Sequence, residues 1–343
     1  MKIFSGADNG LVILHPMSPT QPSSLPDRKV LRIVFMGTPE FAVASLDALV
    51  QAGYLIVAVV TAPDKPAGRG MKLTESAVKK YAAEKGLKIL QPLKLKDPLF
   101  VEELRSLKAD IQIVVAFRML PEVVWNMPPM GTINVHGSLL PQYRGAAPIN
   151  WAVINGEKET GVTTFKLQHE IDTGNILLQQ RFAIGDDETA GEVHERMKET
   201  GAKLLVQTID GLIGGTIEET VQHHSPLTTH HLPLTTNHLK HAPKIFTETC
   251  RINWDKPVNE IYNLIRGLSP FPGAFTLLGE KTLKIFRAKK DMTIPLIPPG
   301  RHESDGKQLL RFSGRDGYIE ILELQLEGKK RMPVDAFLRG NKV

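Results

Sequence analysis

The sequence has little of what marks a secreted or membrane protein. It contains one cysteine, Cys250, so no disulfide can form within the chain, and this usage fits a reducing cytosol. No apolar run approaches the roughly 18 residues that a membrane-spanning helix needs. The apolar run at 11–14 is too short for the core of a signal peptide. We therefore expect a cytoplasmic protein without a membrane partner.

What remains is the composition of an ordinary globular protein. The chain has 343 residues, of which 42% are hydrophobic and 23% are charged, so a substantial core can form. At roughly 150 residues per domain, this length predicts about two domains. The net charge of +5 points only weakly to a polyanionic partner.

Changes in periodicity divide the chain. Residues 1–29 are rich in proline and serine, which predicts a disordered leader or a start site placed too early, with Met17 as the alternative start. We expect a first domain over 30–214, an irregular linker over 215–244 and a second domain over 245–343.

The first domain alternates apolar strand-length runs with helical patterns. Expected strands lie at 30–36, 54–60, 87–90, 111–116 and 131–136, and expected helices at 39–53, 74–86 and 98–107. This alternation predicts an α/β fold, with a Rossmann-like open, mostly parallel sheet and helices on both faces. An antiparallel pair at 162–167 and 176–184 and a helix at 189–211 complete the domain.

The second domain has a different pattern. A helix at 258–266 leads into short strands separated by glycine and proline turn signals. That spacing predicts a small C-terminal β-barrel, which we expect to be OB-like.

Three polar residues stand out near strand ends of the first domain. Asn134 and His136 are two residues apart on one strand, so their side chains share a face, and Asp172 opens a turn between the antiparallel strands. Ligands of such sheets bind at the carboxyl ends of strands. Each residue alone has an ordinary structural explanation, but an amide, an imidazole and a carboxylate together can move protons and hold a developing oxyanion. The set favours an enzyme.

Several ordered stretches resemble a known family. They are Asn-Val-His at 134–136, Ser-Leu-Leu-Pro at 138–141, Arg-Gly-Ala-Ala-Pro at 144–148 and Asp-Thr-Gly at 172–174. Together they resemble the folate-dependent formyltransferases. Gly-Thr-Pro-Glu-Phe-Ala at 37–42 and Pro-Asp-Lys-Pro-Ala-Gly-Arg-Gly at 63–70 resemble the branch that formylates initiator methionyl-tRNA. The resemblance runs from about residue 31 to the C-terminus.

The resemblance implies a reaction and its catalytic residues. A formyl group would move from the co-substrate 10-formyltetrahydrofolate to the α-amino group of methionine on initiator tRNA, without a metal. The amide of Asn134 and the imidazolium of His136 would donate to the oxyanion, each donor typically worth roughly 3 kcal/mol. Asp172 would keep His136 charged and relay the proton that leaves the amine.

The resemblance also implies two binding regions. Residues 30–214 would be the catalytic domain and 245–343 a tRNA-binding domain of a monomeric enzyme. The folate site would be lined by Ser138, Leu139, Leu140 and Pro141.

The loop at 63–72 carries two glycines, two prolines and the basic residues Lys65, Arg69 and Lys72. It lacks the spacing of a phosphate-binding P-loop. Its composition leaves a solvated surface loop and a phosphate-seeking loop equally open. The resemblance implies that the loop enters the tRNA acceptor stem, with Arg69 the most critical residue.

Two basic clusters lie in the second domain. Residues 281–290 hold five cations and no acid, and 329–331 hold three more. Charge runs are usually solvated faces, but on a small β-barrel we expect contacts with tRNA phosphates. Six histidines at 223–241 are not expected to bind a metal, because no carboxylate or cysteine completes a ligand set.

Three other functions remain open. A sugar-nucleotide formyltransferase would use the same Asn-His-Asp set on a small amine, which has no need of a basic loop. A formyl-folate hydrolase would replace the amine by water. A non-catalytic RNA-binding protein on the same scaffold has no need of the three polar residues.

Overall fold

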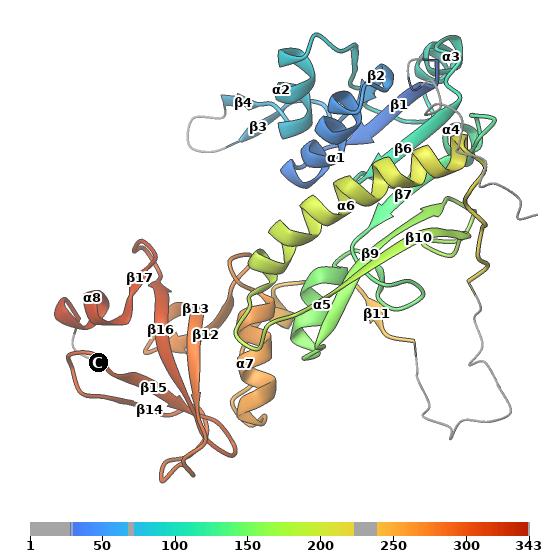
Figure 1. Ribbon diagram of the computed structural model, residues 1–343. Coiled ribbons are helices and arrows are strands. Elements are labelled where there is room, and N and C mark those ends of the chain that lie inside the picture. Colours follow the sequence, from blue (N-terminus) through green and yellow to red (C-terminus); the bar gives the residue numbers. More distant parts are fainter. Residues whose placement is uncertain (1–27, 29, 68–71, 223–238, 342–343) are drawn as a thin grey trace, which may run out of the picture.

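The computed structural model describes residues 28, 30–67, 72–222 and 239–341 (Figure 1), and the statements below refer to these residues. The first part of the chain builds a sheet with one core on each face, and the last part builds a third core of its own. No helix in these described segments is long and apolar enough to cross a membrane.

The large sheet has seven strands in the order β10-β9-β7-β6-β1-β2-β5. Their bounds are β1 Arg32–Gly37, β2 Leu55–Val60, β5 Ile89–Leu90, β6 Ile111–Val115, β7 Thr132–His136, β9 Glu159–Lys166 and β10 Ile176–Ala183. The first five of these run parallel to one another, whereas β9 runs antiparallel to both of its neighbours, β7 and β10. The predicted Rossmann-like sheet is confirmed.

Helices cover both faces of the sheet (Figure 1). Their bounds are α1 Glu40–Gln51, α2 Ala77–Glu84, α3 Pro98–Ser106, α4 Glu122–Trp125, α5 Pro148–Ile154 and α6 Ala190–Ile213. Ile133 and Val135 of β7 belong to the core under α1 and α6, while Val114 of β6 belongs to the opposite core with α3 and α4. Because side chains alternate along a strand, Asn134 and His136 face away from α6.

The loop at 63–72 differs from its prediction. Lys65–Ala67 (β3) and Lys72–Thr74 (β4) pair antiparallel, so the loop forms the arms of a hairpin. The helix expected to begin at Thr74 begins at Ala77, because Ser76 caps it by accepting the N–H of Lys79 at 3.0 Å. The prediction overlooked Ser76 as the better cap.

The C-terminal part forms an antiparallel sheet in the order β12-β13-β16-β15-β14, with β17 beside β16. Its elements are η1 Glu248–Cys250, α7 Val258–Gly267, β12 Ala274–Leu278, β13 Lys281–Asp291, β14 His302–Ser304, β15 Leu310–Ser313, β16 Tyr318–Leu326, β17 Met332–Pro333 and α8 Val334–Arg339. Trp254 stacks on Phe312 at 4.9 Å inside it. We predicted a small C-terminal β-barrel, and the observed antiparallel sheet forms a half-barrel.

The described ends of the expected linker contact the first part of the chain. Thr220 exchanges two 2.8 Å backbone hydrogen bonds with Ile176 of β10. At the other end, His241–Ala242 (β11) pairs in parallel with Arg144–Gly145 (β8). The expected domain limits themselves stay a prediction, as does the leader, of which the structure describes only Arg28.

Candidate active site

Asn134 and His136 lie at the carboxyl end of β7, as predicted. Asn134 is partly exposed, and its side-chain amide makes no hydrogen bond to any residue that the structure describes. A primary amide has two N–H donors and one acceptor oxygen. The Asn134 amide therefore has donors to offer a substrate.

His136 is 6% exposed, and its two ring nitrogens face different groups. Nε2 lies 3.0 Å from the carbonyl oxygen of Tyr143, and because a carbonyl can only accept, Nε2 carries a proton. Nδ1 lies 3.9 Å from Oδ2 of Asp172. That distance is within ion-pair range but too long for a direct hydrogen bond. Because Nε2 is occupied by Tyr143, Nδ1 is the ring nitrogen that is available to a substrate.

Asp172 is held by its own turn and by the backbone of Gly145 rather than by His136. Its Oδ2 accepts the backbone N–H of Gly145 at 2.9 Å, and its backbone adopts the left-handed φ of 55°. Two residues later, a Cβ on Gly174 would lie 1.6 Å from the carbonyl oxygen of Lys166, so only glycine fits there. This tight turn carries the carboxylate across to the end of β7.

One short segment touches both ionisable groups. The carbonyl of Tyr143 holds His136, and the N–H of Gly145 holds Asp172. Tyr143 has a φ of 60° and Gly145 a φ of 125°, and a Cβ on Gly145 would lie 2.5 Å from the carbonyl oxygen of Ala242. Sequence reasoning missed this contribution because main-chain groups carry no residue signature, although 144–148 was recognised as a motif.

The four residues expected at the folate site differ in accessibility. Ser138 is fully buried and donates to the carbonyl of Gln142 at 2.6 Å, and Leu140 is 3% exposed. Leu139 and Pro141 are partly exposed. The hydroxyl of Thr163 organises the turn, because it accepts the N–H of Leu140 at 3.1 Å and donates to the carbonyl of Ser138 at 2.6 Å.

The three expected tRNA contacts in the loop at 63–72 are only partly described. Lys65 is exposed on β3, Arg69 lies outside the described residues, and of Lys72 only the backbone in β4 is described. The base of the loop is anchored by Asp64, which pairs with Lys79 at 2.5 Å. Hydrogen bonds from Lys79 and Gln91 lower the pKa of the Asp64 carboxyl.

Three of the five basic side chains at 281–290 are already bound to other groups of this protein. Arg287 pairs with Glu192 of α6 at 2.5 Å, Lys290 donates to Asn259, and Lys284 donates to the carbonyl of Pro272. In the second cluster, Arg331 pairs with Glu323. Lys281 and Lys289 are exposed and have no ion-pair partner in the described part of the chain.

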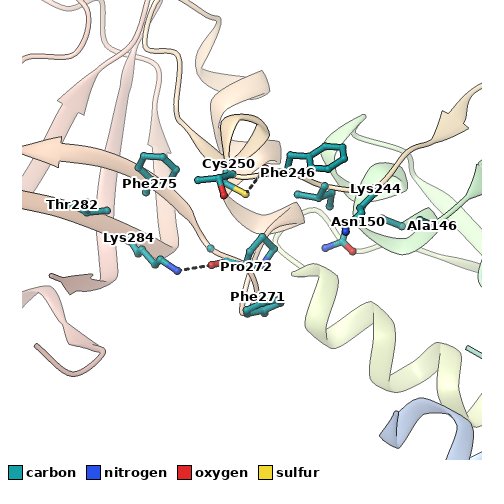
Figure 2. Close-up of a pocket in the computed structure, with 14 residues that line it drawn as sticks. Ala146, Asn150, Lys244, Phe246, Cys250, Phe271, Pro272, Phe275, Thr282 and Lys284 are labelled. Carbon is teal, nitrogen blue, oxygen red and sulfur yellow. Dashed lines mark hydrogen bonds between the residues drawn. The ribbon is translucent and has the colours of Figure 1, made fainter. Parts of the chain in front are cut away.

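A cavity of about 500 Å³ opens between the two parts of the chain (Figure 2). Lys244, Asn150 and Ala146 lie on one side of it, Thr282, Phe275 and Lys284 on the other, and Phe271 and Pro272 between them. Phe271 is 81% exposed. Because Ala146 directly follows Gly145, the cavity adjoins the segment that holds Asp172. Cys250 also lines it, and burial raises the pKa of this thiol, as suits the inert cysteine of a structural position.

Within the described residues, no group of three or more histidine, cysteine, aspartate or glutamate side chains is arranged to hold a metal ion. Of the six histidines at 223–241, the structure describes only His241. The prediction that they bind no metal therefore stays a prediction.

Comparisons with known proteins agree with this architecture. Residues 31–209 match the formyl transferase family model, and 244–342 match the model of the formyl transferase C-terminal domain. A structure of an N-formyltransferase from Helicobacter canadensis, in complex with folinic acid and dTDP-3-aminofucose, aligns with a TM-score of 0.63 at 22% identity. The alignment covers 88% of this chain and 100% of the Helicobacter canadensis chain. At 22% identity, this similarity shows only that the two proteins share a fold.

Sequence relatives are much closer. The chain is 52% identical to the methionyl-tRNA formyltransferase of Bacteroides thetaiotaomicron over 315 residues, which cover 90% of this chain and 95% of the relative. It is 53% identical to the methionyl-tRNA formyltransferase of Phocaeicola vulgatus, over 92% of this chain and 97% of the relative. The chain thus belongs to the formyl transferase family, in its methionyl-tRNA formyltransferase branch.

Proposed function

We propose that this protein transfers the formyl group of 10-formyltetrahydrofolate to the α-amino group of methionine on initiator methionyl-tRNA. The observation that carries the proposal is the meeting of Asn134, His136 and Asp172 at one strand end, in a chain about half identical to methionyl-tRNA formyltransferases. Folate as co-substrate fits the family and the partly exposed Leu139 and Pro141 beside this strand end.

In the reaction, a bond forms between the amine nitrogen and the formyl carbon while the bond from that carbon to N10 of the folate breaks. Negative charge develops on the formyl oxygen, where the Asn134 amide and Nδ1–H of His136 donate hydrogen bonds. Asp172 stabilises the positive imidazolium at 3.9 Å. It also accepts the proton that leaves the amine, and the departing N10 takes up a proton in turn.

The acceptor end of the tRNA reaches this site along the cavity between the two parts of the chain. Exposed Phe271 offers a face on which a base can stack, and Lys244 and Lys289 offer charges to phosphates. These contacts tolerate any sequence, because every base has a π-face and every nucleotide a phosphate. The small amine of a sugar nucleotide requires no such path, which favours tRNA over that alternative.

The direct test measures formyl transfer from 10-formyltetrahydrofolate to methionyl-initiator tRNA. Parallel reactions without tRNA, and with an amino-sugar nucleotide instead, detect hydrolysis and sugar formylation. We expect rapid formation of formylmethionyl-tRNA and little product in the other two reactions. Sugar formylation without tRNA formylation would reject the proposal.

Arg69→Ala tests the role of the loop at 63–72. We expect kcat/KM for charged tRNA to fall about 10-fold or more through loss of a phosphate contact, with unchanged formyl-folate affinity. Lys80→Ala, which removes an exposed cation from α2 nearby, is the matched control and should behave like wild type. Equal loss of tRNA use and folate binding would assign Arg69 to folate or to folding.

Translation initiation places this activity in the cytoplasm. That the enzyme acts as a monomer stays a prediction.

A further inference from the structure

Gln222 lies in the expected linker, 50 residues from Asp172, yet its side chain is 4% exposed and directed at the catalytic loop. Its Nε2 donates to two carbonyl oxygens, that of Asp172 at 3.1 Å and that of Gly174 at 2.7 Å. One carbonyl belongs to Asp172, the left-handed residue itself, and the other to the glycine two residues later. One amide group therefore ties together the two ends of the Asp172–Gly174 segment.

The other end of the same amide binds the segment that holds both catalytic side chains. Its Oε1 accepts from Arg144, at 3.2 Å from Nε and 2.6 Å from a terminal nitrogen. Gly145, the next residue, donates its N–H to Oδ2 of Asp172. The contacts close a ring from Gln222 through Arg144 and Gly145 to Asp172 and back to Gln222.

Tyr143 extends the ring to His136, because its carbonyl accepts from Nε2 of that histidine. Burial lowers the pKa of the Arg144 guanidinium, and the charges of Asp172 and Glu170 oppose this shift. Each member of the ring is thus buried or partly buried, and each constrains the next. A shift of Gln222 must move the Asp172 carboxylate, the Tyr143–Gly145 segment or both.

We propose that Gln222 is a positioning residue of the formyl transfer, which sets the separation of the Asp172 carboxylate from Nδ1 of His136 through the carbonyls of Asp172 and Gly174. The inference rests on the proposed function for its kinetic consequences, but the geometry stands without it. Through Gln222, the described start of the expected linker helps to position the Asp172 carboxylate. Gln222 itself touches no reacting atom.

The experiment compares Gln222→Met, which keeps the length of the side chain but removes its hydrogen bonds, with Gln222→Glu, which keeps the acceptor for Arg144 and loses both donors. Displacement of a catalytic group by about 1 Å can cost on the order of 100-fold in rate. We expect kcat to fall about 10- to 100-fold in both variants, with KM for tRNA and for formyl-folate within about twofold of wild type.

Gln112→Met is the matched control. Gln112 is a buried glutamine on β6, 1% exposed, which accepts from Thr132 at the other end of β7. Its substitution should lower the thermal unfolding midpoint about as much as Gln222→Met does, while kcat stays near wild type. A drop in kcat in proportion to lost stability in both variants would make the role of Gln222 merely structural and overturn the proposal.

A double-mutant cycle with Asp172→Asn identifies the route of the effect. If Gln222 acts through Asp172, Gln222→Met should change the residual rate of Asp172→Asn by less than about twofold, because interacting sites are not additive. Full additivity of the two losses would overturn the proposal. So would wild-type kcat in Gln222→Met.

A substrate-free readout separates this inference from the proposed function. The ¹⁵N resonance of His136 Nδ1 should shift in Gln222→Met in the same direction as in Asp172→Asn, and stay in place in Gln112→Met. An unmoved resonance overturns the positioning role whatever the enzyme formylates. Absence of tRNA formylation by the wild-type protein rejects the proposed function and leaves this test intact.

Discussion

The strand end that carries His136 differs in construction from the seam, as we call the boundary between the first part of the chain and its C-terminal part, where Phe271 lies. At the strand end, His136 is 6% exposed and Gln222 4%, and backbone groups at fixed distances hold the ionisable side chains. At the seam, Phe271 is 81% exposed, and the side chains of Lys244 and Lys289 are exposed too. Bond-making requires sub-ångström placement, whereas a nucleic acid is held by many contacts that each tolerate movement.

The largest expected effects come from breaking the strand-end site. We expect His136→Ala and Asp172→Asn each to lower kcat about 10²- to 10³-fold, because each removes stabilisation of charge that develops in the reaction. Folate affinity should stay within about threefold, since neither side chain is needed for ground-state binding. Single-turnover formylation and equilibrium folate binding would measure the two quantities. Near-normal turnover in both variants would contradict the assignment.

At the seam, Phe271→Ala should act on substrate binding. Loss of a stacking face is typically worth about 1–3 kcal/mol, so we expect KM for tRNA to rise about 5-fold or more with kcat nearly unchanged. Phe271→Trp, which retains a stacking face, should restore binding. If kcat falls instead while KM holds, the cavity belongs to the catalytic geometry rather than to the tRNA path.

Salt dependence distinguishes free from paired cations. Lys289→Ala should reduce the slope of log affinity for tRNA against log salt by roughly 0.9, the value for one phosphate contact on a duplex. Arg287→Ala is the matched control on the same strand. Its guanidinium is already paired with Glu192, so its loss should change the slope far less. Equal changes in slope would show that the ion pair opens when tRNA binds.

The smallest effect concerns the ion pair across the seam. Burial raises the pKa of the Glu192 carboxyl, but hydrogen bonds from Thr189 and Arg287 outweigh it, so the pKa is lowered overall. A lowered folded-state pKa stabilises the protein above the unfolded value of about 4.3 and loses this contribution as the pH falls through the folded value. Since the side chain is 45% exposed, we expect less than about 1 kcal/mol.

Glu192→Gln tests this contribution by thermal unfolding. The variant should melt about one to a few degrees below wild type at pH 7, and the difference should shrink below about pH 4 as the wild-type carboxyl takes up a proton. A difference that is constant with pH would trace to the capping box at Thr189, where glutamine replaces glutamate as acceptor.

The sequence predicted helices and strands correctly where its apolar pattern fitted only one type of secondary structure. The apolar run at 111–116 is strand β6, and the helix expected at 189–211 is α6 with Thr189 as its N-cap. The hairpin of β3 and β4 was missed, because three residues are too few to show the apolar–polar alternation that identifies a strand. Arg287 looked free because its acidic partner, Glu192, lies 95 residues away in the chain.

The sequence by itself determined the chemical groups and their order. Asn134 and His136 share a face because β-strands alternate, and Asp172 is followed two residues later by the glycine that its turn requires. The tertiary structure alone decided the 3.9 Å approach of Asp172 to His136, the main-chain partners of both, and the place of Gln222 behind them. These contacts join residues separated by up to 78 positions, and no local periodicity encodes a meeting at that range.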